Sequence, residues 1–402
     1  MHFLAPHLLL ALPSAAAKPY STWMADSQIA RGVTPTRWYT EATFYRGVEA
    51  VANLTSNATY LTFLTQSINA ILSPNTTSSS PPFKGWDLTD HQLDNIRIGS
   101  PILFLLQTTH SPNPRQQQLH AAATFLHTQL VQSQPRTASG GFWHKSPKYP
   151  NQMWLDGLFM ALPFYASYVS LFQPTNVTAW DDILLQFSLI EAHCRNQTSG
   201  LLKHGYDESR VAVWADPITG ASPLVWIRAQ GWYFMALVDV LEIFPRSHPG
   251  WERLRGWWVD LARALRREQD GGSGGWWLVM DSGYPGRAGN YIESSGTAMY
   301  TYGLLKGVRM GLFMGDGDDA EKYVDVARRA YGLMIRKFVT TTTTTTGDGL
   351  INWEGTVKVG SLDGRGDFNY YTGIPVAQNS LIGIGPFILA SVDMERANLT
   401  PM

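Results

Sequence analysis

The sequence predicts an all-α protein whose helices come in pairs that pack side by side into a toroid. Apolar residues recur at helical spacing in long segments along most of the chain, and strongly alternating strand patterns are scarce. One helical pair gives way to the next roughly every 60 to 80 residues, and repeated hairpins that must bury their faces on neighbours form solenoids or closed toroids.

The loops between the expected helices alternate between long and short ones. Long loops rich in glycine and aromatic residues, such as 207–225 and 271–294, precede alternate helices. Because elaborate loops on a rigid scaffold tend to carry function, we expect the functional site at one end of the toroid. Short strands are expected only at Trp276–Met280 and Leu350–Trp353. The expected helices are Trp38–Ala52, Leu93–Gln107, Pro114–Val131, Gln152–Ser170, Ala179–Arg195, Trp226–Ile243, Trp251–Arg267, Ser295–Phe313, Asp319–Phe338 and Ala377–Asp393.

The composition favours one large domain over residues 18–402. The chain has 402 residues, of which 44 % are hydrophobic and 12 % aromatic, and no Pro/Ser-rich linker divides its middle. A net charge of −1 with 16 % charged residues offers no basic field for nucleic acid. Fifteen Trp and seventeen Tyr supply core volume, and they are also the residues that stack on sugar rings.

Residues 1–17 have the pattern of a signal peptide, an apolar stretch followed by small residues. The stretch is too short for a bilayer anchor, which takes about 20 apolar residues. No later segment is expected to cross a membrane, so the mature chain should begin near Lys18 and be soluble and secreted. The single cysteine, Cys194, permits no intrachain disulfide and is expected to be a buried small hydrophobe.

Glycosylation signals agree with a secretory route. Six asparagines stand two residues before a threonine with no intervening proline. The run of seven threonines at Thr340–Thr346 is typical of a disordered or O-glycosylated loop without chemistry. The candidate N-glycosylation sites are Asn53, Asn57, Asn75, Asn176, Asn196 and Asn398.

Asp156 is the first candidate for catalysis. It lies in the first turn expected of a strongly apolar helix, where the helix dipole stabilises a carboxylate by about 0.3–1 kcal/mol. Trp154 precedes it by two residues and supplies an aromatic wall. An ordinary acidic residue at a helix N-terminus is the alternative interpretation.

A second cluster joins His204-Gly205 to Trp226, Arg228 and Trp232. The last three residues cannot form one stripe on a regular helix, so Arg228 can point from a first helical turn into a cavity. An arginine among indoles pairs with a carboxylate while the indoles stack on the ring that carries it, which suits an acidic sugar. Packing of Arg228 on core aromatics is the alternative.

Asp87, Asp90, His91 and Asp94 precede another apolar segment. Any of them could cap a helix, and Asp94, nearest the helix start, is also placed to be a second catalytic carboxylate. Metal-ligand spacings, a nucleophile elbow, a Walker loop and a dinucleotide fingerprint are all missing from the sequence. We therefore expect neither a metal nor a cofactor.

These motifs together resemble the unsaturated uronyl hydrolases. The resemblance rests on residues 152–160, His204-Gly205, Trp226-x-Arg228-x-x-Gly231-Trp232 and residues 295–299, and it extends from about Arg37 to about Met394. Glycoside hydrolase family 105, the unsaturated rhamnogalacturonyl hydrolases, is the most similar branch, with family 88, the unsaturated glucuronyl hydrolases, as its neighbour. The resemblance implies an (α/α)6 barrel, six helical hairpins closed into a ring.

The resemblance also implies a reaction unlike ordinary glycoside hydrolysis. The substrate is an oligosaccharide with a 4,5-unsaturated uronic acid at its non-reducing end. Asp156 protonates C4 of the vinyl ether and helps water to add at C5, after which the hemiketal opens and the aglycone leaves. Because this carboxyl group must be an acid and then a base, we expect apolar neighbours such as Trp154 to raise its pKa.

The other matching positions take roles at the same site. Asp94 matches the second carboxylate, His204 a residue near the reacting double bond, and Arg228 the residue that faces the uronate carboxylate. The aromatic walls and weaker substrate contacts are Trp154, Trp226, Trp232, Tyr39 and His144.

The sequence thus predicts a secreted, metal-independent hydrolase of pectin-derived unsaturated galacturonyl fragments. The N-glycosylation signals and the threonine run indicate a fungal member, and a monomer is the default. Three alternatives remain: an unsaturated glucuronyl hydrolase, an inverting barrel glycosidase with carboxyls about 6.5–9.5 Å apart, and a sugar-binding toroid without catalysis.

Overall fold

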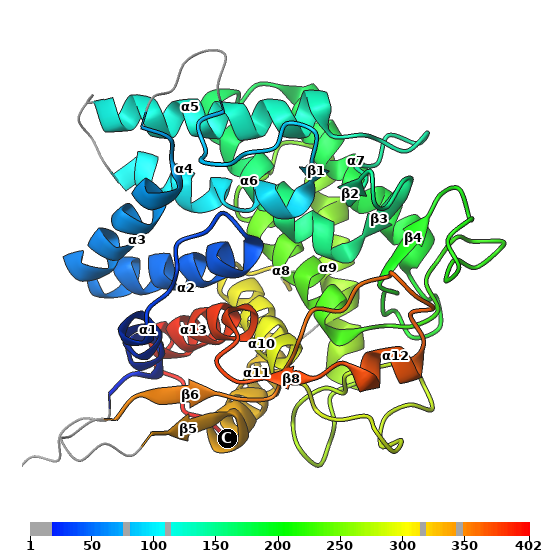
Figure 1. The fold of residues 1–402 in the computed structure, drawn as a ribbon. Coiled ribbons are helices and arrows are strands. Elements are labelled where there is room, and N and C mark those ends of the chain that lie inside the picture. Colours follow the sequence, from blue (N-terminus) through cyan, green and yellow to red (C-terminus); the bar gives the residue numbers. More distant parts are fainter. Residues whose placement is uncertain (1–17, 75–80, 109–113, 314–318, 343–348) are drawn as a thin grey trace, which may run out of the picture.

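Six helices form a closed inner ring in the computed structural model, which describes residues 18–74, 81–108, 114–313, 319–342 and 349–402 (Figure 1). Each inner helix packs against the next, and the last packs against the first. In ring order they are α2 (Tyr39–Thr55), α4 (Gly99–Thr108), α6 (Leu155–Phe172), α8 (Ile227–Leu241), α10 (Ser294–Arg309) and α13 (Leu381–Arg396).

A second layer of helices surrounds this ring. Every outer helix packs against at least one inner helix, as α7 does on α6 and α9 on α8. Six inner and six outer helices among the described residues make the (α/α)6 barrel that the sequence motifs implied, and this prediction is confirmed. The outer helices are α1 (Tyr20–Arg31), α3 (Ala58–Ile71), α5 (Pro114–Thr128), α7 (Val177–Cys194), α9 (Gly250–Arg267) and α11 (Ala320–Leu333).

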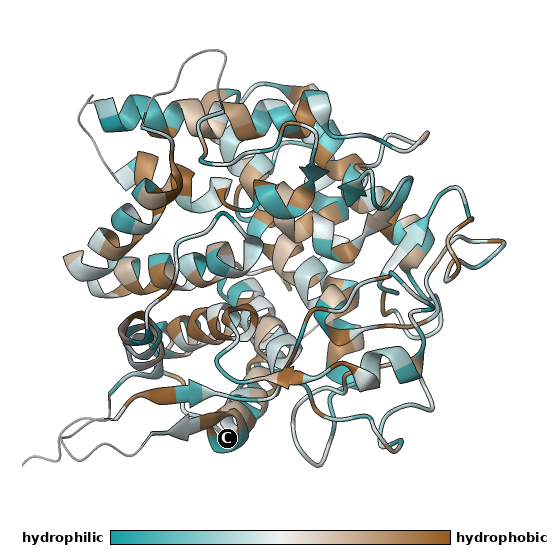
Figure 2. Ribbon diagram, in the orientation of Figure 1, coloured by the Kyte–Doolittle hydropathy of each residue, from teal (hydrophilic) through white to brown (hydrophobic). Residues whose placement is uncertain are grey.

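Burial separates the two layers. Every residue of α8 is buried, because the helix has neighbours on all sides, whereas α9 buries one face and exposes the other. A helix that is apolar all round belongs in a core, and an amphipathic one belongs at the surface. Figure 2 shows the same contrast between the apolar residues of α13 and the polar first turns of α5.

Two glycines allow α8 and α10 to approach closely. A Cβ on Gly231 of α8 would lie 2.5 Å from Sδ of Met299, and a Cβ on Gly296 of α10 would lie 2.4 Å from Cγ1 of Ile227. These residues belong to two of the motifs that suggested the family. Part of the sequence signature therefore specifies the crossing of two inner helices.

Several element boundaries differ from expectation. Helices α1 and α3 were missed. The segment expected as one helix from Leu93 to Gln107 is a 3₁₀ turn, η1 (Leu93–Ile96), followed by α4. Two expected helices end in π-helical turns, η2 (Gln129–Ser133) and η3 (Met334–Phe338), and α13 begins at Leu381 rather than near Ala377.

The strands also need correction. Residues 276–280 form isolated bridges and not a strand, whereas β6 (Ile351–Trp353) is a strand as expected. Its partner β5 (Val339–Thr341) was not expected, because Thr340 and Thr341 begin the run that was predicted to be a disordered loop. Residues expected to open a helix instead form β3 (Gln152–Trp154), which pairs with β4 (Gly205–Asp207).

Further short strand pairs connect loops at the end of the barrel where the inner helices begin. They are β1 (His91–Gln92) with β2 (Lys145–Ser146) and β7 (Thr356–Val357) with β8 (Val376–Ala377), and α12 (Phe368–Gly373) lies between the last two.

Helix α6 is long and apolar enough to cross a membrane by composition, contrary to the expectation that no segment after residue 17 would be. It is the only such helix among the described residues, and 72 % of the apolar window is buried inside the protein. Its composition is accounted for by its place in the inner ring. The proposed signal peptide, Asn75 and Thr343–Thr346 lie outside the described residues.

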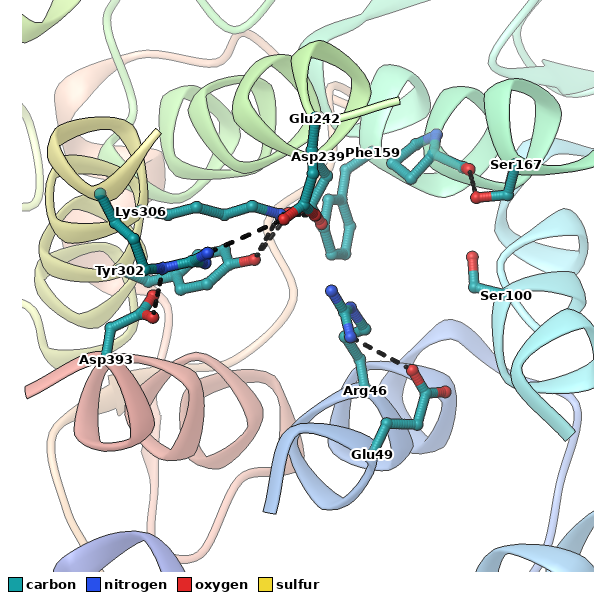
Figure 3. A network of polar contacts seen from close by, with 12 residues as sticks. Arg46, Glu49, Ser100, Phe159, Ser167, Asp239, Glu242, Tyr302, Lys306 and Asp393 are labelled. Atoms are coloured by element: carbon teal, nitrogen blue, oxygen red, sulfur yellow. Dashed lines mark hydrogen bonds and ion pairs between the residues drawn. The ribbon is translucent and has the colours of Figure 1, made fainter. Parts of the chain in front are cut away.

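A network of buried charges closes the other end of the barrel, where the inner helices end (Figure 3). Lys306 Nζ lies 2.6 Å from Asp239 Oδ1 and 2.8 Å from Glu242 Oε2, and the Tyr302 hydroxyl also donates to Asp239. Nearby, Arg46 pairs with Glu49 beside a cavity of about 150 Å³. Buried charges of both signs thus neutralise one another at this end.

Candidate active site

The N-terminal ends of the inner helices bring the predicted site residues together. Tyr39 is the first residue of α2, Asp94 lies in η1 just before α4, and Asp156 and Arg228 are the second residues of α6 and α8. Helix N-termini carry partial positive charge and unpaired N–H groups, and both favour an anion. The end of the barrel that holds the candidate residues therefore suits an acidic ligand.

Asp156 and His204 form the centre of this group. Nε2 of His204 lies 3.0 Å from Oδ2 of Asp156, and the His204 side chain is fully buried while that of Asp156 is 13 % exposed. The strand pair β3–β4 sets this contact by placing Trp154 opposite Gly205. A Cβ on Gly205 would lie 2.7 Å from the carbonyl oxygen of Met153, so the glycine permits the approach.

The direction of the pKa shift at Asp156 is opposite to the expected one. Burial by itself raises the pKa of this carboxyl group, but the adjacent His204 outweighs it, with His144 adding to the effect, so the pKa is lowered. The prediction of a raised pKa was wrong because it counted the apolar neighbours and not the imidazole. The free protein therefore holds Asp156 as a carboxylate at neutral pH.

Asp94, the second candidate carboxylate, lies beside two basic side chains. Its carboxylate oxygens are 4.0 Å from Nε2 of His144 and 3.7 Å from Nζ of Lys145. Burial lowers the pKa of His144 even though Asp94 and Asp156 both oppose the shift, so this imidazole is neutral at pH 7. A Cβ on Gly157 would lie 3.1 Å from Nδ1 of His144. This close contact explains why a residue without a side chain follows Asp156.

Aromatic rings stack along one side of the two carboxylates. The ring centroid of Trp154 is 4.4 Å from that of His144 and 4.4 Å from that of Tyr149. Trp226 packs on His204 with centroids 4.9 Å apart. Both tryptophans are nearly fully buried, so these stacked rings hold the imidazoles of His144 and His204 in place.

Trp232, like Trp226, is almost fully buried. It stacks on Phe159 of the inner ring at 4.6 Å and meets Tyr39 edge-on at 6.4 Å. With 1 % of its surface exposed, Trp232 lies under Tyr39 as a support.

Arg228 has donor capacity that the described residues leave unused. Nη2 donates to the carbonyl oxygens of Val357 and, at 2.7 Å, of Lys358. Nη1 is buried without a hydrogen-bond partner, and the guanidinium carbon lies 5.2 Å from the ring centroid of Trp226. A buried unpaired guanidinium N–H is costly, so an acidic ligand at this place would stabilise it.

Sequence reasoning missed three residues at the site, Lys145, Tyr149 and Tyr371. Lys145 faces Asp94 and Tyr149 stacks on Trp154. The Tyr371 hydroxyl lies 2.8 Å from Nδ1 of His204, although 167 positions separate the two residues. No local pattern could have revealed that contact, whereas the basic Lys145 beside His144 was a visible signal.

The remaining predicted features are placed as follows. Cys194 is buried, as expected. Asn53, Asn57, Asn176 and Asn398 are exposed and Asn196 is partly buried. Within the described ranges, no three His, Cys, Asp or Glu side chains gather as a metal site.

Comparison with known proteins decides the family. The model of Glycosyl Hydrolase Family 88 matches residues 17–398. The chain belongs to this family. A solved glycoside hydrolase of family 105 from C. acetobutylicum is 35 % identical, with a TM-score of 0.84 over 94 % of this chain and 100 % of that one. The resemblance to families 105 and 88 is thus confirmed, and with it the activity of a glycoside hydrolase.

Two curated bacterial relatives add detail. Protein Atu3128 of Agrobacterium fabrum is 35 % identical over 237 residues, which cover 58 % of this family 88 chain and 96 % of the relative. The unsaturated rhamnogalacturonyl hydrolase YesR of Bacillus subtilis is 25 % identical over 67 % of this chain and 70 % of its own length.

Proposed function

We propose that the protein removes a 4,5-unsaturated uronic acid, most specifically unsaturated galacturonic acid, from the non-reducing end of pectin-derived oligosaccharides. Membership in family 88 and the likeness to YesR support this substrate class. The observation that carries the proposal is the contact of 3.0 Å between His204 Nε2 and Asp156 Oδ2, because the carboxyl is partly exposed while its partner is buried. A substrate can reach the acid from one side only.

In this proposal Asp156 gives a proton to C4 of the vinyl ether and then takes one from the water that adds at C5. The two steps balance, since the proton lost to carbon returns from water. The resulting hemiketal opens and releases the aglycone. The free protein holds Asp156 as a carboxylate, so the proton must be gained when substrate binds. The substrate carboxylate and the exclusion of water both favour the protonated form.

Other residues bind and orient the sugar. The unpaired Nη1 of Arg228 donates a hydrogen bond to the uronate carboxylate, whose charge the convergent helix N-termini also favour. Tyr39, the first residue of α2, is assigned to binding the sugar, because its hydroxyl feels the charges of Asp94, Arg228 and Asp156. Asp94 on η1, which lies 3.7 Å from Nζ of Lys145, is assigned to the same site as the second carboxylate.

The test is a panel of three substrates with the purified protein. Loss of the absorbance of the conjugated double bond on a lyase digest of rhamnogalacturonan supports the proposal. If the absorbance falls only with unsaturated glucuronyl oligosaccharides, the protein carries out the same reaction on that substrate class instead. Cleavage of saturated oligosaccharides, or binding without turnover, would replace it with an inverting glycosidase or a sugar-binding protein.

We also propose that the protein is a secreted, N-glycosylated monomer of fungal origin. The signal-peptide pattern and the exposed sequons support this, although the relatives named above are bacterial. Expression in a fungal host tests it. The proposal predicts protein in the medium whose mass falls after enzymatic removal of N-glycans and which migrates as one chain in solution; cell-retained, unmodified or oligomeric protein would contradict it.

A further inference from the structure

Tyr371 contacts His204, which in turn contacts the proposed catalytic acid Asp156. Its hydroxyl oxygen is 2.8 Å from Nδ1 of His204, while Nε2 of the same ring faces Asp156. His204 and Tyr371 are both fully buried. Tyr371 lies on α12, a short helix on the same side of the molecule as β3 and β4 (Figure 1). The three side chains thus form a line from the protein interior to the partly exposed carboxylate.

The chemistry of imidazole gives this line a direction. A neutral histidine carries its proton on one ring nitrogen, and the partner of the other nitrogen selects which one. Burial raises the pKa of the Tyr371 hydroxyl far above its usual value, so it keeps its proton and can donate to Nδ1. A donor at Nδ1 leaves the imidazole proton on Nε2, the ring nitrogen that lies 3.0 Å from Oδ2 of Asp156.

We propose that Tyr371 is a positioning residue, which holds His204 in the tautomer that presents Nε2–H to Asp156. The inference rests on the proposed role of Asp156 as acid and base. With Nε2–H directed at it, the carboxylate is stabilised after it gives up its proton to C4, and the ring cannot turn away between the two proton transfers.

The ionisable groups around this line are few. Asp156 from α6 and His144 from the loop before β2 act on His204, and their effects on Asp156 are described above. Tyr370, Asp156, Asp281 and Asp367 act on Tyr371, and all of them keep its hydroxyl protonated. A change in pH dependence on removal of this hydroxyl therefore reports on the His204–Asp156 pair.

Tyr371 also has a packing contact that must be separated from its hydroxyl. Its ring stacks on Trp226 with centroids 5.5 Å apart and an interplanar angle of 16°. Tyr371→Phe keeps the stacked ring and removes only the oxygen. Tyr331→Phe is the matched control, because Tyr331 is also a buried tyrosine, and its hydroxyl bonds Ser391 between two helices far from the site.

The experiment compares the kinetics and stability of the two variants with the wild type on the unsaturated substrate. We expect Tyr371→Phe to lower kcat about tenfold or more and to change KM by less than about threefold. The limb of the pH–rate profile that reports Asp156 should move to higher pH, since the carboxylate loses its fixed donor. Tyr331→Phe should lower the unfolding temperature and leave kcat and the pH profile unchanged.

Nitrogen NMR of labelled histidine gives a readout that needs no turnover. The His204 signals, assigned by their loss in His204→Gln, should show the Nε2–H tautomer in the wild type and a mixture in Tyr371→Phe. A folded Tyr371→Phe protein with wild-type tautomer, kcat and pH profile would overturn the inference. A wild type inactive on every unsaturated substrate would refute the proposed function instead, and the tautomer would still decide the role of Tyr371.

Discussion

His204 and Asp156 are joined twice. Their side chains meet at 3.0 Å, and the backbone N–H of Leu155, the residue before Asp156, donates to the His204 carbonyl oxygen at 3.0 Å. The first residue of α6 is therefore hydrogen-bonded to the backbone of the residue whose side chain contacts the Asp156 carboxylate. The side-chain contact with His204 explains why the pKa of Asp156 is lowered despite burial.

Replacing His204 should raise the pKa of Asp156, because burial then acts without the opposing imidazole. For His204→Gln we expect kcat to fall about a hundredfold, in the range of general acid–base contributions. The Asp156 limb of the pH–rate profile should move to higher pH. His120→Gln, on the exposed surface of α5, is the control and should behave as wild type. An unmoved limb in His204→Gln would contradict the electrostatic explanation.

Arg228 should act on binding more than on chemistry. Arg228→Lys removes the free Nη1 donor as well as the bonds to the carbonyls of the β7 segment. A lost charged hydrogen bond costs about 1.5–3 kcal/mol, so we expect KM to rise roughly 10- to 150-fold with a smaller change in kcat. For substrates that are methyl-esterified at the uronate, Arg228→Lys should change KM little relative to the wild type. Equal losses on both substrates would show that Arg228 does not read the carboxylate.

The crossing of α8 and α10 should depend on Gly231. Gly231→Ala places a methyl group against Met299, and such overpacking typically costs about 1–3 kcal/mol. Gly256→Ala on α9 is the matched control, because its Cβ would meet no atom within 4 Å. An alanine there should stabilise the protein by about 0.5–1 kcal/mol through helix propensity. Chemical unfolding of both variants measures their free energies of unfolding. Equal changes in the two variants would contradict the close approach of α8 and α10 at Gly231.

The charged end of the barrel should control stability and not activity. Lys306→Met leaves Asp239 buried without its cation, which typically costs about 3–5 kcal/mol. The double variant with Asp239→Asn should recover part of this loss, because the uncompensated charge is gone. KM for the substrate should stay unchanged, since the pair lies at the opposite helix ends from Asp156. A stable single variant, or one with altered KM, would contradict this assignment.

The same end predicts the pH dependence of stability. Lys306 and Arg46 outweigh burial and lower the pKa of Asp239 to about 2, so its stabilising contribution is present above pH 4 and is lost as the pH falls toward 2. Burial raises the pKa of Glu49 to about 7, so stability falls as the pH rises from about 4.5 to 7. In Glu49→Gln, the fall in stability between about pH 4.5 and 7 should disappear from unfolding curves measured between pH 4 and 8. If this fall persists in the variant, Glu49 is not its cause.

Much of the architecture could be predicted because the inner helices carry continuous apolar patterns. The same patterns located Asp156 and Arg228 in first helical turns. Helix α1 escaped because its mean hydropathy is close to neutral, and α3 because threonine and serine interrupt its apolar face. Gln152–Trp154 was misassigned because pairing with β4, a contact distant in sequence, overrides the local helical pattern.

The site was predicted in its residues and not in its electrostatics. Motifs identified Asp156, His204 and Arg228 separately, but a pKa depends on contacts that only the fold creates. Burial of an acid is visible in an apolar sequence, whereas the approach of an imidazole from β4 is not. Tyr371 illustrates the same limit, since α12 reaches His204 only through the closure of the ring.

Hydration of the double bond by Asp156 can be followed as the ultraviolet absorbance of an unsaturated galacturonyl oligosaccharide during incubation with wild type and Asp156→Asn. We expect the absorbance to fall with the wild type, with one aglycone released for each double bond lost. Folded Asp156→Asn should leave the absorbance almost unchanged and release almost no aglycone. Persistent absorbance with the wild type, or equal rates with Asp156→Asn, would contradict hydration by Asp156.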